Sequence, residues 1–101
     1  MIVVNGIIKT TTAAINAISA ALSKMEQASQ AEDGCFDYTF SIEVSEPTVI
    51  RLTERWASME DLKRHFAEPH MTEFQAAMAE HPPTSVEVKF YQAEEIDPPG
   101  R

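Results

Sequence analysis

The histidines are the residues of this 101-residue chain that could transfer a proton near neutral pH. An unperturbed imidazole titrates near pH 6.5, so it can accept a phenolic proton. His65 adjoins Phe66 at the border of an apolar stripe, where it either lines a pocket or packs as a structural, partly solvated side chain. His70 follows Pro69 and either shares that chemistry or serves the start of its own helix, and His81 is expected at the surface.

Asn5 is a candidate hydrogen-bond donor, because it interrupts an apolar, β-branched segment where asparagine is disfavoured. Strand alternation places Asn5 opposite Val4 and Ile8, so it points into a barrel interior if those two face the helices. A buried amide without partners costs on the order of 1–3 kcal/mol. Asn5 is therefore either satisfied by backbone or water, or it holds a substrate oxygen or dioxygen.

Trp56 is the only tryptophan, and it stands at a strand end before a loop, where pocket walls often form. Alternation groups it with Ile50 and Leu52, which face the helices if strand pairing is regular. A bulge would reverse that orientation. Trp56 is thus either a core residue or an aromatic wall of a pocket.

No metal or cofactor is expected from the sequence. His65, Glu68 and His70 span a proline with a spacing of five between the histidines. Zinc motifs place two histidines four residues apart on one helix, or use Cys/His sets. The glycines lie far apart, so no phosphate-binding loop is present.

Composition predicts one ordinary domain, with 44% hydrophobic and 24% charged residues. The net charge of −8 and the lack of Lys/Arg clusters argue against nucleic acid as a partner. No run approaches the ~20 apolar residues that cross a bilayer, so no membrane partner is expected. Cys35 is the sole cysteine, expected to pack in the core, and a cytoplasmic location is expected.

Hydrophobic periodicity predicts the first half of the fold. A strand over residues 2–8 precedes a helix that ends near Gly34 and presents one apolar face. Strict alternation follows from residue 35 to 44, and its apolar face is predicted to lie under the helices. That helix carries Ile15, Ile18, Leu22 and Met25, and the strand carries Phe36, Tyr38, Phe40, Ile42 and Val44.

The second half continues the hairpin with a strand over residues 49–56. Ser58 and Asp61 approximate a capping box at the start of a short helix, and Pro69 separates it from the next one. Alternation then predicts a last strand around residues 86–90. The apolar stripes of the two helices are Met59, Leu62 and Phe66, and Met71, Phe74 and Met78.

The resulting order, β-α-β-β-α(α)-β, predicts an α+β fold, the ferredoxin-like split β-α-β antiparallel sheet with helices on one face. Val3, Ile7 and Val49 are expected on the opposite, otherwise polar face. A face of such mixed character favours pairing with a second sheet.

The segment between the third strand and the last helix resembles the antibiotic biosynthesis monooxygenase (ABM) family, which includes quinol monooxygenases. The likeness extends over residues 1–93, with 94–101 as a C-terminal tail. The matching features are the strand Arg51–Trp56, then Leu62, His65, Phe66, Pro69-His70-Met71 and Phe74.

This resemblance implies a homodimer that forms a dimeric α+β barrel, and a cofactor-independent monooxygenase acting on a small quinol or phenolic substrate. It implies a base at His65, with His70 as a second candidate, and a pocket amide at Asn5. Trp56, Phe66 and Phe74 would bind the aromatic substrate. In the haem-degrading relatives the axial histidine aligns near Gln75, a poor ligand, so haem is not expected.

Two other functions remain open. Some relatives resemble isomerases of small phosphorylated diketones, which would require Arg51, Arg55 and Lys63 or Arg64 to converge at the pocket. A non-catalytic dimer that binds a small hydrophobic molecule is the second, because fold does not fix function.

Overall fold

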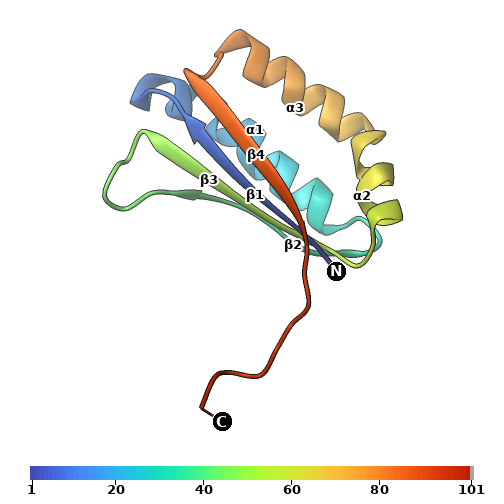
Figure 1. Cartoon of the computed structure of the whole chain (residues 1–101). Helices are drawn as coiled ribbons and strands as arrows, with labels where there is room; N and C mark the ends of the chain where they lie inside the picture. The colour runs from blue at the N-terminus through green and yellow to red at the C-terminus, as the bar shows by residue number, and fades with distance from the viewer. Residues whose placement is uncertain (101) are drawn as a thin grey trace.

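The protein is described by a computed structural model that places residues 1–100. One sheet and three helices form two layers, and the segment after the last strand runs away from the body (Figure 1). The elements in chain order are β1 (Ile2–Lys9), α1 (Thr12–Gln30), β2 (Cys35–Ile42), β3 (Val49–Trp56), α2 (Met59–Phe66), α3 (Pro69–Glu80) and β4 (Ser85–Gln92).

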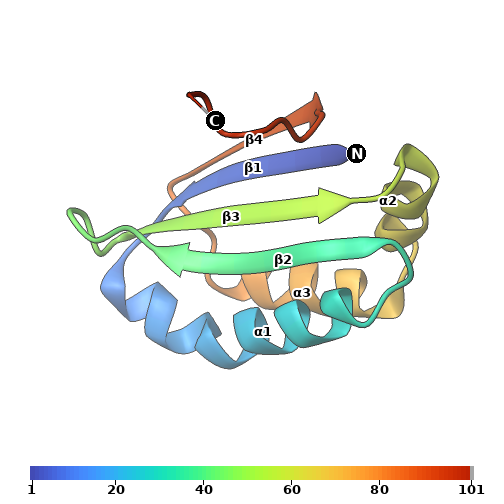
Figure 2. The same ribbon diagram turned by 90° about the horizontal axis from the view of Figure 1, so that it is seen from below.

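The sheet has the strand order β2-β3-β1-β4, and every neighbouring pair is antiparallel. The register of the central strand β1 pairs Val4 with Glu54 on one side and with Phe90 on the other. Figure 2 shows α1 and α3 below the sheet and α2 at its end, with the other face uncovered. The predicted ferredoxin-like α+β fold is confirmed.

Helix α1 begins at a threonine cap, because Thr11 Oγ1 accepts a hydrogen bond of 3.1 Å from the amide of Ala14. Its buried face carries Ile18, Leu22 and Met25, as the periodicity predicts. The helix ends at Gln30, four residues before Gly34, which was the predicted end. Gly34 has a φ of 80° within the turn that follows.

Helix α2 buries a different stripe from the predicted one. Leu62 and His65 are its buried residues, whereas Met59 and Phe66 are 41% and 53% exposed. His65 and Phe66 are three and four positions after Leu62, so they flank the helix face that Leu62 occupies, one on each side. The orientation of α2 therefore selects His65 rather than Phe66 for the core.

Strand β2 contains a bulge that the alternation did not reveal. Cys35 pairs with Trp56 and Asp37 pairs with Arg55, so Phe36 is an extra residue on this strand. Cys35 consequently packs against the core, and Phe36 is 57% exposed. The prediction that Phe36 lies under the helices is wrong for this reason.

The rest of the predicted apolar face of β2 is only partly buried. Tyr38 is in the core and Phe40 packs against it. Ile42 is 46% exposed at the sheet edge, and Val44 lies beyond the strand and is almost fully exposed. Coverage by the helices therefore fades toward this end of β2.

The core lies between α1, α2 and the sheet in two adjoining clusters. One contains Ile2, Val4, Met25, Tyr38, Trp56 and Leu62; the other contains Ile8, Ile18, Leu22 and Ile50. By contrast, every residue of β4 is exposed, including Val86, Val88 and Phe90. The helices thus leave the side chains of this edge strand largely exposed.

The open face of the sheet has the predicted mixed character. Val3 and Ile7 are half-buried and Val49 is buried. Charges on or beside this face are paired with each other, as in Arg51–Glu43, Arg55–Asp37 and Lys89–Glu87. Within residues 1–100, no helix has both the length and the apolar character needed to cross a membrane.

Candidate functional site

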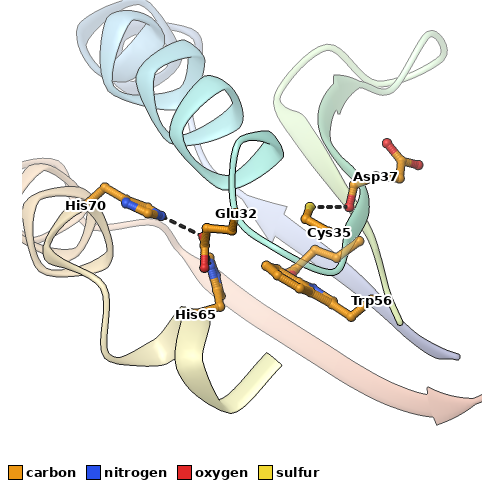
Figure 3. Close-up of polar contacts among 7 residues, drawn as sticks. Glu32, Cys35, Asp37, Trp56, His65 and His70 are labelled. Carbon is orange, nitrogen blue, oxygen red and sulfur yellow. Dashed lines mark hydrogen bonds and ion pairs between the residues drawn. The ribbon is translucent and has the colours of Figure 1, made fainter. Parts of the chain in front are cut away.

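A cluster of titratable side chains lies where the helices meet the end of β3. The Nδ1 atom of His65 is 2.7 Å from Glu32 Oε2, and the Nε2 atom of His70 is 2.8 Å from the same oxygen. The His65 side chain is 1% exposed, Glu32 10% and His70 15%. Figure 3 shows the two imidazoles on either side of the Glu32 carboxylate. We call these three residues the His–Glu–His cluster.

Glu32 is held in place by the turn between α1 and β2. Its amide donates to the carbonyl of Ser29 at 3.0 Å, and its carbonyl accepts from the amide of Cys35 at 3.3 Å. The lack of a side chain at Gly34 allows this turn to pack closely against α2, because an added Cβ would stand 2.3 Å from Asp61 Cγ. The turn therefore has little freedom to move the carboxylate away from α2.

The break between α2 and α3 brings the two histidines together. His65 is the penultimate residue of α2, and His70 is the second residue of α3. The Glu68 amide donates to the His65 carbonyl at 3.1 Å, and Pro69 at the first position of α3 prevents a continuous helix. The imidazole centroids are 5.9 Å apart as a result.

Trp56 and Glu54 form the wall of the cluster on the sheet side. Trp56 is fully buried, its ring lies 4.8 Å from that of His65, and its Nε1 donates to Glu54 Oε1 at 2.8 Å. Trp56 thus faces the helices, as regular alternation along β3 predicts. Burial raises the pKa of Glu54 to about 7, and the charge of Glu32 acts in the same direction.

Tyr38 and Cys35 border the cluster but stay protonated near neutral pH. The Tyr38 ring is 5.4 Å from that of His65, and burial raises the pKa of its phenol far above the usual range. Burial likewise raises the pKa of the Cys35 thiol to about 11. A thiol in this state is a poor nucleophile, which agrees with the predicted packing role of Cys35.

The hydrogen bonds within the cluster fix where a proton can be accepted. An ionised carboxylate only accepts hydrogen bonds. With Glu32 ionised, His65 Nδ1–H and His70 Nε2–H both donate to it. A neutral imidazole carries one proton, so His65 Nε2 and His70 Nδ1 keep their lone pairs. Each histidine then presents one basic nitrogen that Glu32 orients.

An apolar groove of about 270 Å³ lies between α3 and the sheet, and none of the three cluster residues lines it. It is large enough for a single aromatic ring with small substituents, near the lower end of ligand pockets. Gly6 lies at the floor of the groove. A Cβ at this position would make a tight contact of 3.1 Å with Leu52 Cβ. The lining residues are Gly6, Ile8, Phe40, Leu52, Phe74, Gln75, Met78, Val86 and Val88.

A row of aromatic rings joins the groove to the cluster. Phe74 stacks on Phe40 with centroids 5.6 Å apart, and Phe40 meets Tyr38 edge to face at 5.7 Å. Tyr38 in turn packs on His65. The groove and the basic nitrogens therefore share one wall without lying in a single open cavity.

Asn5 does not join this site within one protomer. It lies exposed on the face opposite Val4 and Ile8, as the alternation predicts. There it lines another hollow, of about 280 Å³, together with Thr53 and Tyr91. The expectation that Asn5 and His65 serve one cavity is wrong, because the sheet stands between them.

The structure divides the predicted substrate-binding residues. Trp56 packs against His65, and Phe74 lines the groove. Phe66 has its ring 5.7 Å from His65 but points outward and is 53% exposed. Phe66 therefore borders the cluster from the solvent side and does not line the groove.

Sequence reasoning missed Glu32, Glu54 and Tyr38 as members of the site. Glu54 had a signal, because it shares the alternation of Leu52 and Trp56 and so falls on the buried face. Nothing in the sequence indicated Glu32, because it lies in a turn 33 residues before His65. Only the packing of that turn on α2 brings it to the histidines.

The arrangement defines a small ferredoxin-like protein with a buried acid–base cluster and an apolar groove, which a row of aromatic rings connects. Residues 1–77 match the sequence profile of the antibiotic biosynthesis monooxygenase family. The chain therefore belongs to that family, which confirms the resemblance seen in the sequence.

Solved structures share the fold over nearly the whole chain. A proposed antibiotic biosynthesis monooxygenase from Deinococcus radiodurans is 26% identical with a TM-score of 0.89, covering 97% of each chain. Rv0793 from Mycobacterium tuberculosis is 25% identical with a TM-score of 0.83, covering 94% of this chain and 96% of its own. A proposed family member from Nitrosomonas europaea, 18% identical, has a TM-score of 0.85 and covers 92% and 98%. A search of curated proteins gives no match.

Proposed function

We propose that this protein is a monooxygenase that oxidises a small electron-rich aromatic, a quinol or a phenol, with dioxygen and without a bound cofactor. The observation that carries the proposal is the row of rings from the groove to His65. It links an apolar site for an aromatic ring to a buried base through Phe40 and Tyr38. Membership of the family supports the reaction class.

The substrate supplies all the electrons in this reaction. An ionised quinol or phenol transfers an electron to dioxygen, and the resulting radicals combine to a peroxide on the ring. Loss of water then leaves a new oxygen function on the carbon. For a quinol the products are a hydroxyquinone and one water, so both atoms of dioxygen are accounted for.

The chain contributes a base and an apolar surface. His65 Nε2, oriented through Nδ1 by Glu32, is the proposed base for the phenolic proton, and His70 is the second candidate. A phenol in the groove reaches His65 only after the rings of Tyr38 and Phe40 have moved aside. Phe40, Leu52 and Phe74 exclude water from the ring. Asn5 has no part in this protomer's site, since it lies across the sheet.

The alternative of an isomerase for a phosphorylated diketone is less well supported. Arg51 is paired with Glu43 and Arg55 with Asp37 by the open face, and Arg64 is paired with Asp61 on α2. These cations are ion-paired, and none of them lines the groove. A phosphate would therefore meet an apolar surface there.

Oxygen consumption tests the proposal. Protein treated with a chelator is incubated with a panel of quinols and hydroxylated aromatics, and the rate is recorded with an oxygen electrode. We expect at least one substrate to be oxidised faster than in buffer. Loss of the base in His65→Ala should lower kcat by about 10²–10⁴-fold, the usual contribution of a general base.

His81→Ala is the matched control, because His81 is exposed beyond α3 and should leave the rate unchanged. A panel without turnover would overturn the monooxygenase. If a quinol binds the wild type and its His65→Ala variant equally well and neither turns over, the third function, a non-catalytic binding protein, is the correct one.

We also propose that two copies pair through their open sheet faces as a homodimer. Val3, Ile7 and Tyr91 supply apolar area on this face, and the neighbouring charges are already neutralised in pairs. Such a face can be covered without leaving single charges buried. In the dimer, Asn5 would lie between the two sheets.

A further inference from the structure

We propose that Glu32, His65 and His70 form a binding site for a divalent transition-metal ion, for which Zn²⁺ is the representative probe. One donor atom from each residue lies within 4.8 Å of the others. His65 Nδ1 and His70 Nε2 are 2.7 and 2.8 Å from Glu32 Oε2. The donors come from three different elements: the α1–β2 turn, α2 and α3.

The geometry of the cluster fits an ion after a small expansion. Zinc bonds nitrogen and carboxylate oxygen at about 2.0–2.2 Å, so tetrahedral donors stand about 3.3 Å apart. The two nitrogens are now 2.7 and 2.8 Å from Glu32 Oε2. Room for the ion requires a shift of about 0.5 Å in the Glu32 carboxylate and rotation of the two imidazole side chains to bring donors that lie within 4.8 Å to this spacing.

The charges around the cluster favour a cation. Glu32 and Glu54 are both largely buried carboxylates. Among residues 1–100 no lysine or arginine is ion-paired with either carboxylate. Buried carboxylates are normally paired with a cation or coordinate a metal.

The donor set indicates which class of ion is bound. Two imidazoles and one carboxylate suit zinc and other transition ions, whereas magnesium and calcium prefer oxygen ligands alone. Three protein ligands leave a fourth position for water, as in catalytic zinc sites. The sequence expectation of no metal considered Glu68 as the third donor, but the carboxylate that meets the histidines is Glu32.

A bound ion would also act on the proposed oxidation, a consequence that rests on the proposed function. An ion at His65 Nδ1 moves the remaining proton of the imidazole to Nε2, because a neutral imidazole carries one proton. His65 then has no lone pair for a phenol, and the same holds for His70. The metal-loaded protein should therefore be inhibited.

Metal binding can be measured without any substrate. Tag-free, chelator-treated protein is titrated with Zn²⁺ by calorimetry and with Co²⁺ by its visible absorption, which reports four-coordinate nitrogen and oxygen ligation. We expect one ion per chain. Glu32→Gln and His70→Ala should weaken the Kd by more than the 10–100-fold typical of losing a partner outside the ligand set.

The controls separate the site from other histidines and from folding defects. His81→Ala should bind Zn²⁺ like the wild type, because His81 lies outside the cluster. Circular dichroism shows which variants fold, and His70→Ala removes a side chain that is already 15% exposed. Zinc should raise the Tm of the wild type and leave that of Glu32→Gln unchanged.

Failure of this site is distinguishable from failure of the oxidation. Substoichiometric zinc uptake, or uptake that Glu32→Gln and His70→Ala share with the wild type, overturns the metal site. Oxygen consumption by chelator-treated protein tests the oxidation alone. If both hold, added Zn²⁺ should slow oxidation by the wild type much more than by His70→Ala.

Discussion

His65 is the most deeply buried histidine of the chain, and its polar neighbours make that burial tolerable. Glu32 accepts from Nδ1, and Trp56 and Tyr38 pack around the ring. A buried polar group without a partner costs about 1–3 kcal/mol. The hydrogen bond between His65 and Glu32 therefore stabilises the fold whether or not His65 takes part in catalysis. The same pairing orients the free nitrogen, so structural and functional roles coincide at this residue.

Glu54 gives a residue-scale prediction about pH. The ordinary carboxyl value is 4.5, and the folded protein raises the pKa of Glu54 to about 7. Between these pH values the folded chain holds a proton that the unfolded chain has lost. Stability from this group is therefore present at low pH and falls as pH rises toward 7. Above pH 7 the buried charge is a net cost.

We expect Glu54→Gln to raise the free energy of unfolding at pH 8 by roughly 1–3 kcal/mol, with little effect at pH 4.5. The amide oxygen can still accept from Trp56 Nε1. Urea denaturation at both pH values measures the difference. Equal destabilisation at the two pH values would show that the burial of charge is not the main effect.

At the scale of elements, the site depends on two chain reversals. The α1–β2 turn carries Glu32 and packs on Asp61 through Gly34, and Pro69 sets the angle between α2 and α3. The histidines lie on two short helices: α2 is capped by the Ser58 side chain, whereas α3 begins at Pro69 without a side-chain cap. A site assembled this way is sensitive to changes in turns that contact no substrate.

Gly34→Ala tests this dependence. Gly34 has a φ of 80°, and its Cβ would overlap Asp61 Cγ at 2.3 Å. We expect the free energy of unfolding to fall by roughly 1–3 kcal/mol, from backbone strain and the displaced turn. Gly100→Ala is the matched control, since Gly100 has a φ of 85° but no atom within 4 Å of its Cβ. Equal stability of Gly34→Ala and wild type, measured in urea, would contradict the role of the turn.

Element order and strand pairing could be predicted from the sequence because hydrophobic periodicity is local. The strand Val49–Trp56 has the predicted bounds. The faces of Phe36 and Phe66 could not be predicted, since a bulge and the rotation of α2 depend on tertiary packing. The role of Glu32 could not be predicted for a related reason, because only the folded turn brings it to His65.

At the scale of the whole molecule, the helices cover one face of the sheet and leave the other for the proposed dimer. Asn5 lies on that uncovered face, so the fold separates two hollows that the sequence suggested were one. Dimerisation would enclose the hollow at Asn5 without closing the groove under α3. The two faces can therefore be tested separately.

We expect the wild type to have twice the 11.3 kDa chain mass in light scattering after size exclusion. Ile7→Lys should convert it to a monomer, because Ile7 is half-buried on the open face and a charge there would be buried in the pair. Ala20→Lys on the exposed side of α1 should remain dimeric. A wild-type mass of 11.3 kDa at micromolar concentration would exclude the dimer.

The bulge in β2 has a further effect on how this chain associates. β2 is one of the two outer strands of the sheet, and an unpaired outer strand offers amide and carbonyl groups to any extended chain. The extra residue at Phe36 interrupts the regular spacing of those groups. The bulge therefore disfavours the addition of further strands, and so fibril growth, at the β2 edge of the sheet.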